Sequence, residues 1–387
     1  MTASRAYLDY NASAPLLPEA REAMLSALDR AANPSSVHTE GRTARGLIED
    51  ARRDVASLVG GQAENVVFTS GATEAAATLL SPHWTLGRGK VRMSRLFVCE
   101  ADHPCLLSGG RFAPEHVSRI GVDADGVVRI GDLHAALKNH EAGEGMPLVA
   151  MHAANNETGV IQPFGEIAAI TKAAGGVFVL DAVQAVGRIA LDLSESCADF
   201  LILSAHKMGG PTGVGAFVAA SGLMMPEPLI RGGGQEKGHR AGTENLAGIA
   251  GFGAAARSAA GGLARVAGIR ALRDRAEDAI HRLAPDAVFF GASADRLANT
   301  SFFAIPGLKA ETAQMALDLA GISVSAGSAC SSGKVGPSHV LKAMGFGGDE
   351  GAIRLSIGAA TTLDEIDRFS AALATVVSRR SSRGRAA

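Results

Sequence analysis

The sequence predicts an α/β protein in which a mostly parallel, doubly wound sheet is followed by a smaller α+β region. Two observations predict this class. Over the first two thirds of the chain, short runs rich in β-branched residues alternate with helix-patterned segments, which is typical of βαβ units. After about residue 260 the pattern changes to a long helical segment, shorter strands and a last helix. The length of 387 residues, 47% of them apolar, is enough for two or three domains with a large core.

The helices of the first part show apolar residues at steps of three and four. This spacing is seen at Leu47, Ile48, Ala51 and Val55, and again in GEIAAITKAA at residues 165–174. Six strands are expected around and between such helices, at residues 66–68, 95–98, 147–151, 177–180, 200–203 and 214–219. Ligands of doubly wound sheets bind beyond the carboxyl ends of the strands, so the residues after each strand carry the functional information.

The second part begins with a long helical pattern that runs from Leu263 to Leu283. Strands are expected at residues 288–290, 301–305 and 322–325. A last helix presents one apolar face, made of Leu363, Ile366, Phe369, Leu373, Val376 and Val377. The tail from Ser378 to Ala387 holds four Arg, and we expect it to be disordered and solvated.

Composition excludes several classes of function. The net charge is 37 − 39 = −2, which gives no electrostatic basis for broad binding to nucleic acids or membranes. No apolar run reaches the ~18 residues that a membrane span needs. The N-terminal residues lack the apolar segment of a signal peptide. We therefore expect a cytoplasmic enzyme without membrane contact.

The four cysteines are far apart and form no CxxC pair, which argues against a disulfide framework and a Cys-rich zinc site, so no metal is expected. Free cysteines are usually buried, as we expect for Cys99 and Cys197. Cys330 differs, because it lies in SAGSACSSGKVG (325–336), which has no apolar anchor. A thiol in such a loop is expected to be exposed and reactive. A tightly packed turn of small residues is the alternative.

Three successive strands are followed by polar residues of complementary chemistry. The strand at 147–151 leads into NNETG (155–159), the next is followed by Asp181, and the third by SAHK, which ends in Lys207. Singly, such residues are more often helix caps or solvated side chains. Together they suit a pyridoxal phosphate site, which needs a lysine for the Schiff base and an acid to keep the pyridine nitrogen protonated.

Two further segments meet the needs of such a site. FTSGATE (68–74) reads as a strand, a small-residue turn and a helix that begins near Thr73, and a helix N-terminus binds phosphate. An ordinary capped helix start explains the same pattern. His103 follows the strand at 95–98, on the same sheet edge. A lone histidine is more often structural, but here its ring is placed to stack on a cofactor and relay protons.

The ordered motifs resemble those of the NifS/IscS-like cysteine desulfurases, which are class V aminotransferase-like, fold-type I pyridoxal phosphate enzymes. The motifs that carry the resemblance span nearly the whole chain: YLDYNASAP (7–15), NPSSVHTEGR (33–42), FTSGATE (68–74), MHAANNETGV (151–160), LDAVQAVG (180–187), SAHK (204–207), GGGQEKGHRAGTEN (232–245), SAGSACSS (325–332) and IRLSIG (353–358). The resemblance implies a large cofactor-binding domain at residues 15–260 with a sheet of the seven-stranded type. Residues 1–14 and 261–387 would form the small domain that carries the Cys330 loop.

The resemblance also implies a role for each matching residue. Lys207 would be the Schiff-base lysine, Asp181 would pair with the pyridinium nitrogen and His103 would stack on the ring. The remaining cofactor contacts would come from Gln184 and Asn156 at the ring hydroxyl and from Ala72, Thr73, Ser204 and His206 at the phosphate, joined by Thr243 from the partner subunit of a homodimer. The substrate carboxylate would be bound by Asn33 and Arg354. Cys330 would accept sulfur from L-cysteine as a persulfide and leave L-alanine.

The implied partner is a sulfur-acceptor or iron–sulfur scaffold protein, in cluster assembly or tRNA thiolation. The sequence departs from the family pattern at a few positions: NASAP replaces a pair of Thr before Pro, Ala205 replaces Gly, Thr212 replaces Lys, and the usual Asn near Ala77 is missing. None of these changes removes a group that the chemistry requires. The alternatives are a selenocysteine lyase, another class V enzyme such as an aminotransferase, or a non-catalytic scaffold of a sulfur pathway. A non-catalytic scaffold would not need Lys207, Asp181 and Cys330, so their presence argues against that alternative.

Overall fold

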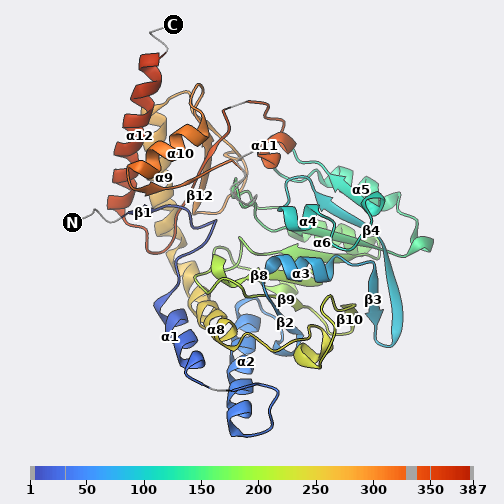
Figure 1. Cartoon of the computed structure of the whole chain (residues 1–387). Helices are drawn as coiled ribbons and strands as arrows, with labels where there is room; N and C mark the ends of the chain where they lie inside the picture. The colour runs from blue at the N-terminus through green and yellow to red at the C-terminus, as the bar shows by residue number, and fades with distance from the viewer. Residues whose placement is uncertain (1–4, 31, 328–337, 349, 384–387) are drawn as a thin grey trace.

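The computed structural model describes residues 5–30, 32–327, 338–348 and 350–383, which form two packed regions (Figure 1). In the larger region nine strands of the described chain form one sheet, in the order β10-β3-β4-β6-β7-β8-β9-β2 with β5 paired to β4. Their bounds are Val66–Thr69 (β2), His83–Leu86 (β3), Gly89–Cys99 (β4), Val117–Ile120 (β5), Met146–His152 (β6), Val177–Asp181 (β7), Phe200–Ser204 (β8), Gly215–Ala219 (β9) and Met224–Pro226 (β10).

The centre of this sheet is parallel. β5, β4, β6, β7 and β8 run in the same direction, whereas β9 and β2 close the sheet antiparallel. These seven strands match the expected sheet, and β3 and β10 extend it beside β4 as antiparallel strands. The predicted α/β class with a mostly parallel sheet is confirmed. Parallel β6, β7 and β8 end at one edge, so the residues after them come close together.

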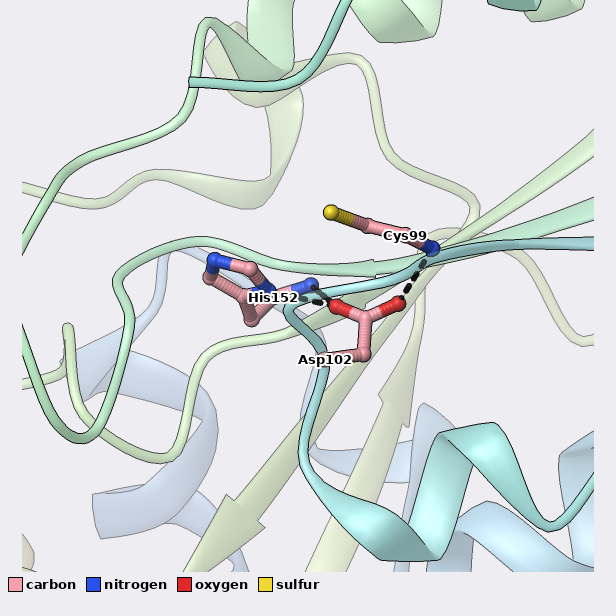
Figure 2. A group of neighbouring side chains, drawn as sticks. All are labelled: Cys99, Asp102 and His152. Atoms are coloured by element: carbon pink, nitrogen blue, oxygen red, sulfur yellow. Dashed lines mark hydrogen bonds and ion pairs between the residues drawn. The ribbon is translucent and has the colours of Figure 1, made fainter. Parts of the chain in front are cut away.

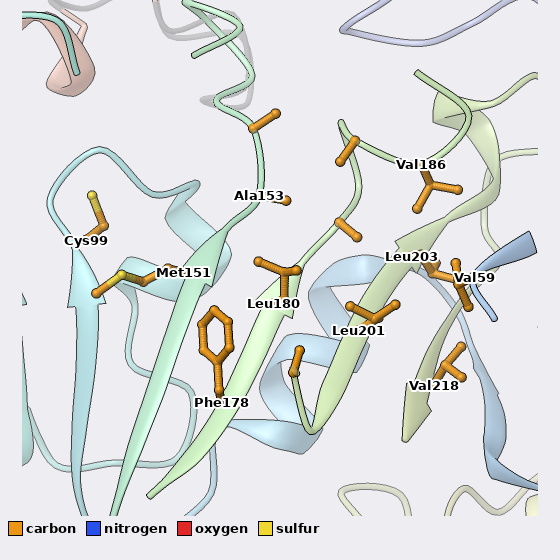
Figure 3. Packing of buried hydrophobic residues seen from close by; sticks show 14 of the residues in the cluster. Val59, Cys99, Met151, Ala153, Phe178, Leu180, Val186, Leu201, Leu203 and Val218 are labelled. Carbon is orange, nitrogen blue, oxygen red and sulfur yellow. The ribbon is translucent and has the colours of Figure 1, made fainter. Parts of the chain in front are cut away.

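Both faces of the sheet are covered, because alternate residues of each strand point to opposite sides. Figure 3 shows one face, where Met151, Phe178, Leu180 and Leu201 pack together on β6, β7 and β8. This face is covered by α2 (Thr39–Leu58), α5 (Ile130–Lys138), α6 (Phe164–Ala173) and α8 (Leu246–Ala260). The opposite face packs against α3 (Ala72–Leu79) and α4 (Pro104–Leu107). Helix α1 (Pro18–Leu28) packs on α8, and the single turn α7 (Leu193–Ser196) precedes β8.

The smaller region has its own antiparallel sheet and its own core. Its strands are β11 (Val288–Phe289), β12 (Thr300–Ala304), β15 (Ile353–Ser356) and β14 (Ser325–Ala326), and β1 (Ala6–Tyr7) pairs with β13 (Ile322–Ser323). The helices are α9 (Val266–Leu283), α10 (Ala310–Leu319), α11 (His339–Ala343) and α12 (Leu363–Arg383). Leu8 packs in this core with Phe303 and Phe369. We therefore propose domains at 15–260 and at 1–14 plus 261–387.

Two expectations from the sequence were wrong. Helix α12 continues to Arg383, so residues 378–383 are not a disordered tail. The side chain of Arg380 donates to Asp286 at 3.1 Å, which ties this part of the helix to the small region. Cys197 is exposed rather than buried, because it ends the short helix α7 in a left-handed conformation, with φ 54°. Among the described residues no helix is both long and apolar enough to cross a membrane.

Candidate active site

A cavity of about 450 Å³ lies beyond the carboxyl ends of β6, β7 and β8, within the size range of cofactor sites. It gathers residues from segments that are far apart in the sequence. Nine of the ten residues expected to bind the cofactor line it: Ala72, Thr73, His103, Asn156, Asp181, Gln184, Ser204, His206 and Lys207. The tenth, Thr243, does not. The predicted convergence at one sheet edge is therefore what the fold produces.

Lys207 ends the single 3-10 turn that follows β8, Ala205–Lys207. Its Nζ donates to the main-chain oxygens of Asn11, at 2.6 Å, and Ala12, at 2.8 Å. The preceding His206 has its Nδ1 3.3 Å from the Ser13 hydroxyl. Burial, and then the charge of Lys207, lower the pKa of His206 to about 4, so this ring is neutral at physiological pH.

Asp181 is the last residue of β7 and is buried at the floor of the cavity. Its carboxylate accepts the Val183 N–H at 3.0 Å. Burial raises the pKa of Asp181, and the Val183 N–H and His103 act against this rise. A protonated nitrogen placed against this carboxylate would offset its desolvation. The floor of the cavity is thus suited to a cationic ring nitrogen.

His103 precedes α4 as its N-cap, and its Nδ1 accepts the Cys105 N–H at 3.2 Å. That contact leaves the proton of the neutral ring on Nε2. Burial lowers the pKa of His103, the charge of Lys207 lowers it further, and Asp181 acts in the opposite sense. His103 therefore presents a neutral ring with one N–H donor at the cavity.

The first turn of α3 forms one wall of the cavity. Its N-cap is Gly71, which offers no side chain to the free N–H groups of that turn. Strand β9 passes directly behind the turn at Gly215, where a Cβ atom would lie 2.7 Å from both Gly71 C and Leu203 O. Only glycine allows this approach. Backbone N–H groups, Thr73 and Ser204 therefore surround a space suited to an anion.

Arg354, on β15, is buried and engaged by the protein itself. Its Nη1 donates to the Asn156 main-chain oxygen at 2.9 Å, and its Nη2 lies 2.8 Å from Asp9 Oδ1. Its Nε has no hydrogen-bond partner among the described residues. Arg354 does not line the cavity itself, but it contacts Asn156, which does. Asn33 is exposed, caps Ser35 N at 2.9 Å, and does not line the cavity.

Thr243 lines a separate cavity of about 170 Å³, whose other lining residues include Ser70 and Gly213. These two residues also line the main cavity, so the two spaces adjoin. Cys330 lies outside the described residues. The residue that resumes the described chain, Ser338, donates from its hydroxyl to the buried Glu157 at 2.5 Å. Burial raises the pKa of Glu157, and the Ser338 hydroxyl opposes that rise.

A buried cluster of Cys99, Asp102 and His152 was not assigned from the sequence (Figure 2). Asp102 holds the His152 ring at 2.5 Å through Oδ1, and accepts the Cys99 N–H at 2.7 Å through Oδ2. The other ring nitrogen of His152 lies 3.1 Å from Gln162 Nε2. Burial raises the pKa of Cys99 well above its ordinary value. The cluster fixes the loop that carries His103. His152 lies in the motif at residues 151–160, but nothing in the sequence showed that it meets Asp102.

Comparison with known families matches residues 6–369 to Aminotransferase class-V. The chain belongs to the class V aminotransferase family. A relative from Cereibacter sphaeroides named cysteine desulfurase is 42% identical over 381 residues, which cover 96% of each chain. An IscS-like cysteine desulfurase of Mycobacterium tuberculosis is 36% identical over 371 residues, covering 94% of this chain and 93% of the relative. The expected family is thus confirmed.

Two solved structures share the fold of this chain. A NifS-like protein from Rickettsia africae superposes with a TM-score of 0.86 at 31% identity, covering 97% of this chain and 99% of that one. A structure of SspA in complex with cysteine gives a TM-score of 0.73 at 26% identity, over 92% of this chain and 100% of that one. The likeness covers at least 92% of this chain and therefore extends over both of its regions.

Proposed function

We propose that this class V enzyme is a pyridoxal phosphate-dependent cysteine desulfurase, which converts L-cysteine to L-alanine and stores the sulfur as a persulfide on Cys330. The observation that carries the proposal is the meeting of Lys207, Asp181 and His103 in one cavity. Full-length relatives named cysteine desulfurase support the choice over an aminotransferase, a selenocysteine lyase or a scaffold.

The cavity fits pyridoxal phosphate in its donor set. Lys207 would hold the cofactor covalently, Asp181 would face its ring nitrogen, and His103 would stack on its ring. The α3 N-terminus with Thr73, Ser204 and His206 would bind its phosphate, and Gln184 and Asn156 its hydroxyl. When bound, the cofactor supplies an electron sink for charge that develops on the substrate carbon atoms. The buried, desolvated carboxylate of Asp181 would keep the ring nitrogen protonated.

Two side chains would each carry out one of the proton transfers. Lys207, as a neutral amine, would take the α-proton of cysteine, and His103 would exchange a proton near the substrate sulfur. The Cys330 thiolate would attack that sulfur. The new S–S bond forms as the carbon–sulfur bond breaks, and the carbon takes a proton to give alanine. Cysteine and the enzyme thiol thus become alanine and an enzyme persulfide, with no external oxidant.

The location and partners follow from the same proposal. Thr243 lies outside its own subunit's cavity, which supports a homodimer in which it completes the partner's phosphate site. A thiol nucleophile needs a reducing compartment, and Cys99, Cys105 and Cys197 are free, which supports the cytoplasm. The persulfide would pass to an acceptor protein of iron–sulfur cluster assembly or tRNA thiolation.

The experiment that tests this function compares Cys330→Ser with Cys105→Ser. Cys105 lines the cavity, so it is the matched control for a thiol close to the substrate. Burial, with Asp181 and Asp102 nearby, raises the pKa of the Cys105 thiol far above neutrality, so it cannot act as the thiolate. Cys330→Ser should bind cofactor and L-cysteine, seen as an absorbance change, yet form alanine only at the background rate. Cys105→Ser should keep most activity. Wild-type alanine and sulfide production by Cys330→Ser would reject the proposal.

A further inference from the structure

Asn11 is fully buried and is the meeting point of the two regions at the cavity. Each of its polar groups has a partner, and these partners come from both regions. Its main-chain N–H donates to Ser356 Oγ at 3.0 Å, and its side-chain Nδ2 donates to Thr300 Oγ1 at 2.9 Å and to Asn156 O at 3.2 Å. Its side-chain Oδ1 accepts from Arg188 Nη1 at 2.7 Å and from Asn299 Nδ2 at 3.0 Å. Its main-chain oxygen accepts from Gln184 Nε2 at 3.0 Å and from Lys207 Nζ at 2.6 Å. This side chain therefore fixes the position of its own carbonyl with little freedom.

The Lys207 amine lies against two carbonyls that Asn11 and Ala12 present side by side. A turn closed by the Ala12 N–H on the Asp9 oxygen, at 3.0 Å, shapes this pair. Carbonyl oxygens only accept hydrogen bonds, and an ammonium group donates more strongly than an amine. The pair is thus a better partner for protonated Lys207 than for the neutral side chain.

We propose that the Asn11 and Ala12 carbonyls form the docking site of the Lys207 amine whenever it is not bonded to cofactor, and that Asn11 is the residue that positions this site. The inference rests on the proposed role of Lys207. In that role the neutral amine takes the α-proton of the substrate and becomes an ammonium group. Docking stabilises it until the proton returns to carbon as alanine forms, which restores the amine. Asn11 acts through this carbonyl pair and does not itself touch the substrate.

The charges around Lys207 make the pKa of its amine sensitive to the charge of the side chain at position 11. Arg188 lies on the other side of Asn11 and also approaches the Lys207 oxygen, with its Nη2 at 3.4 Å. Burial, and then Arg354, lower the pKa of Arg188 to about 10, which still leaves it charged at neutral pH. Six other titratable residues line the cavity with the amine: Glu74, His103, Cys105, His152, Asp181 and His206. Asn11 is the neutral residue between two cations, so a charge placed there acts on both.

The test measures the pKa of the Lys207 amine in the full-length chain freed of cofactor. Acetic anhydride is applied over a range of pH, and mass spectrometry of the peptide that contains Lys207 gives the rate of acetylation. The midpoint of the acetylation rate against pH gives the pKa of the Lys207 amine. Asn11→Ala, which releases the carbonyl pair, should lower this midpoint by about one pH unit. Asn11→Asp, which keeps the shape and adds a negative charge, should raise it by about one pH unit. Damage to the fold would not move the two variants in opposite directions.

Thr171→Val is the control. Thr171 is as buried as Asn11, and its hydroxyl donates to Ile167 O at 2.7 Å within α6, outside the cavity lining. It should lower stability and leave the midpoint unchanged. Equal midpoints in wild type and both Asn11 variants would overturn the docking site. If Asn11→Ala does not fold, a midpoint for Asn11→Asp that fails to rise overturns it as well. Acetylation needs no turnover, so the docking site and the proposed function can fail separately. If the wild-type chain has no desulfurase activity but the Asn11 variants still shift the midpoint as expected, the proposed function is rejected and the docking site stands.

Discussion

The cavity edge of the large sheet and the Arg354 side of the small sheet prepare their charged groups in opposite ways. At the cavity edge, Asp181 is buried, and among the described residues its carboxylate accepts one hydrogen bond, from the Val183 N–H, and forms no ion pair with a lysine or arginine. On the small sheet, Arg354 is just as buried but already paired with Asp9 and the Asn156 oxygen. The first side leaves a charge for a ligand to satisfy, whereas the second satisfies its charge internally.

On this difference we expect the free-energy cost of binding to be different for a cofactor and for a substrate. A cofactor would enter a preformed site and relieve the desolvation of Asp181. A substrate carboxylate would have to take over a guanidinium group from Asp9, because removing one partner of a buried ion pair leaves an uncompensated charge. The Asp9 side chain is 17% exposed, so water can receive it when the exchange occurs. Substitutions on the two sides should therefore alter different kinetic constants.

The largest expected effect is that of Lys207→Ala, on the cavity edge. No other described lysine lines this cavity, so the variant should lose all alanine production. Borohydride should fix cofactor covalently to the wild-type chain and not to the variant, as read by the mass of the intact protein. A cofactor adduct on purified Lys207→Ala chain would place the covalent lysine elsewhere.

Asp181→Asn should be nearly as inactive, and it tests the unsatisfied charge directly. The amide has almost the same shape but cannot hold a proton on the ring nitrogen, so we expect a loss of at least about 100-fold in kcat, the scale of one lost electrostatic group. Because burial of Asp181 opposes ionisation, the cofactor-free variant should be as stable as the wild type or more so. Near-normal kcat, or a marked loss of stability without cofactor, would contradict this view of the cavity floor.

A smaller effect is expected on the small sheet, from Arg354→Lys. Lysine cannot bind a carboxylate bidentately, so KM for L-cysteine should rise by about 10-fold or more while kcat changes less. Asp9→Asn is the matched variant, because it removes the internal competitor and leaves the guanidinium group in place. It should lower KM while lowering the urea midpoint of unfolding. If Arg354 serves the fold alone, both variants would lose stability and neither would change KM.

The two sides also differ in how much of them could be predicted from the sequence. Asp181 and Lys207 follow strongly apolar strands, so their shared edge could be read from the strand pattern alone. The ion pair between Arg354 and Asp9 joins residues 345 positions apart and has no local signal. The docking of Lys207 on the Asn11 carbonyl was equally hidden, because it uses main-chain atoms that every residue possesses. Cys197 was misplaced because the left-handed end of a four-residue helix is decided by the local turn rather than by hydrophobicity.

The smallest expected effect concerns pH, and it belongs to the cavity edge. In the folded chain the pKa of His206 is about 4, against an ordinary value of 6.5, because burial and the Lys207 charge disfavour its protonation. Between these two values the unfolded chain binds a proton that the folded chain does not, so the free energy of unfolding falls as pH falls. His206→Gln cannot titrate and keeps a polar group near Ser13. Urea unfolding of the cofactor-free chain at pH 7 and pH 5 should therefore show a larger loss of stability for the wild type than for His206→Gln. An equal loss in both would mean that the His206 ring takes up its proton in the folded cavity as readily as in water, which would contradict burial and the Lys207 charge as causes of its lowered pKa.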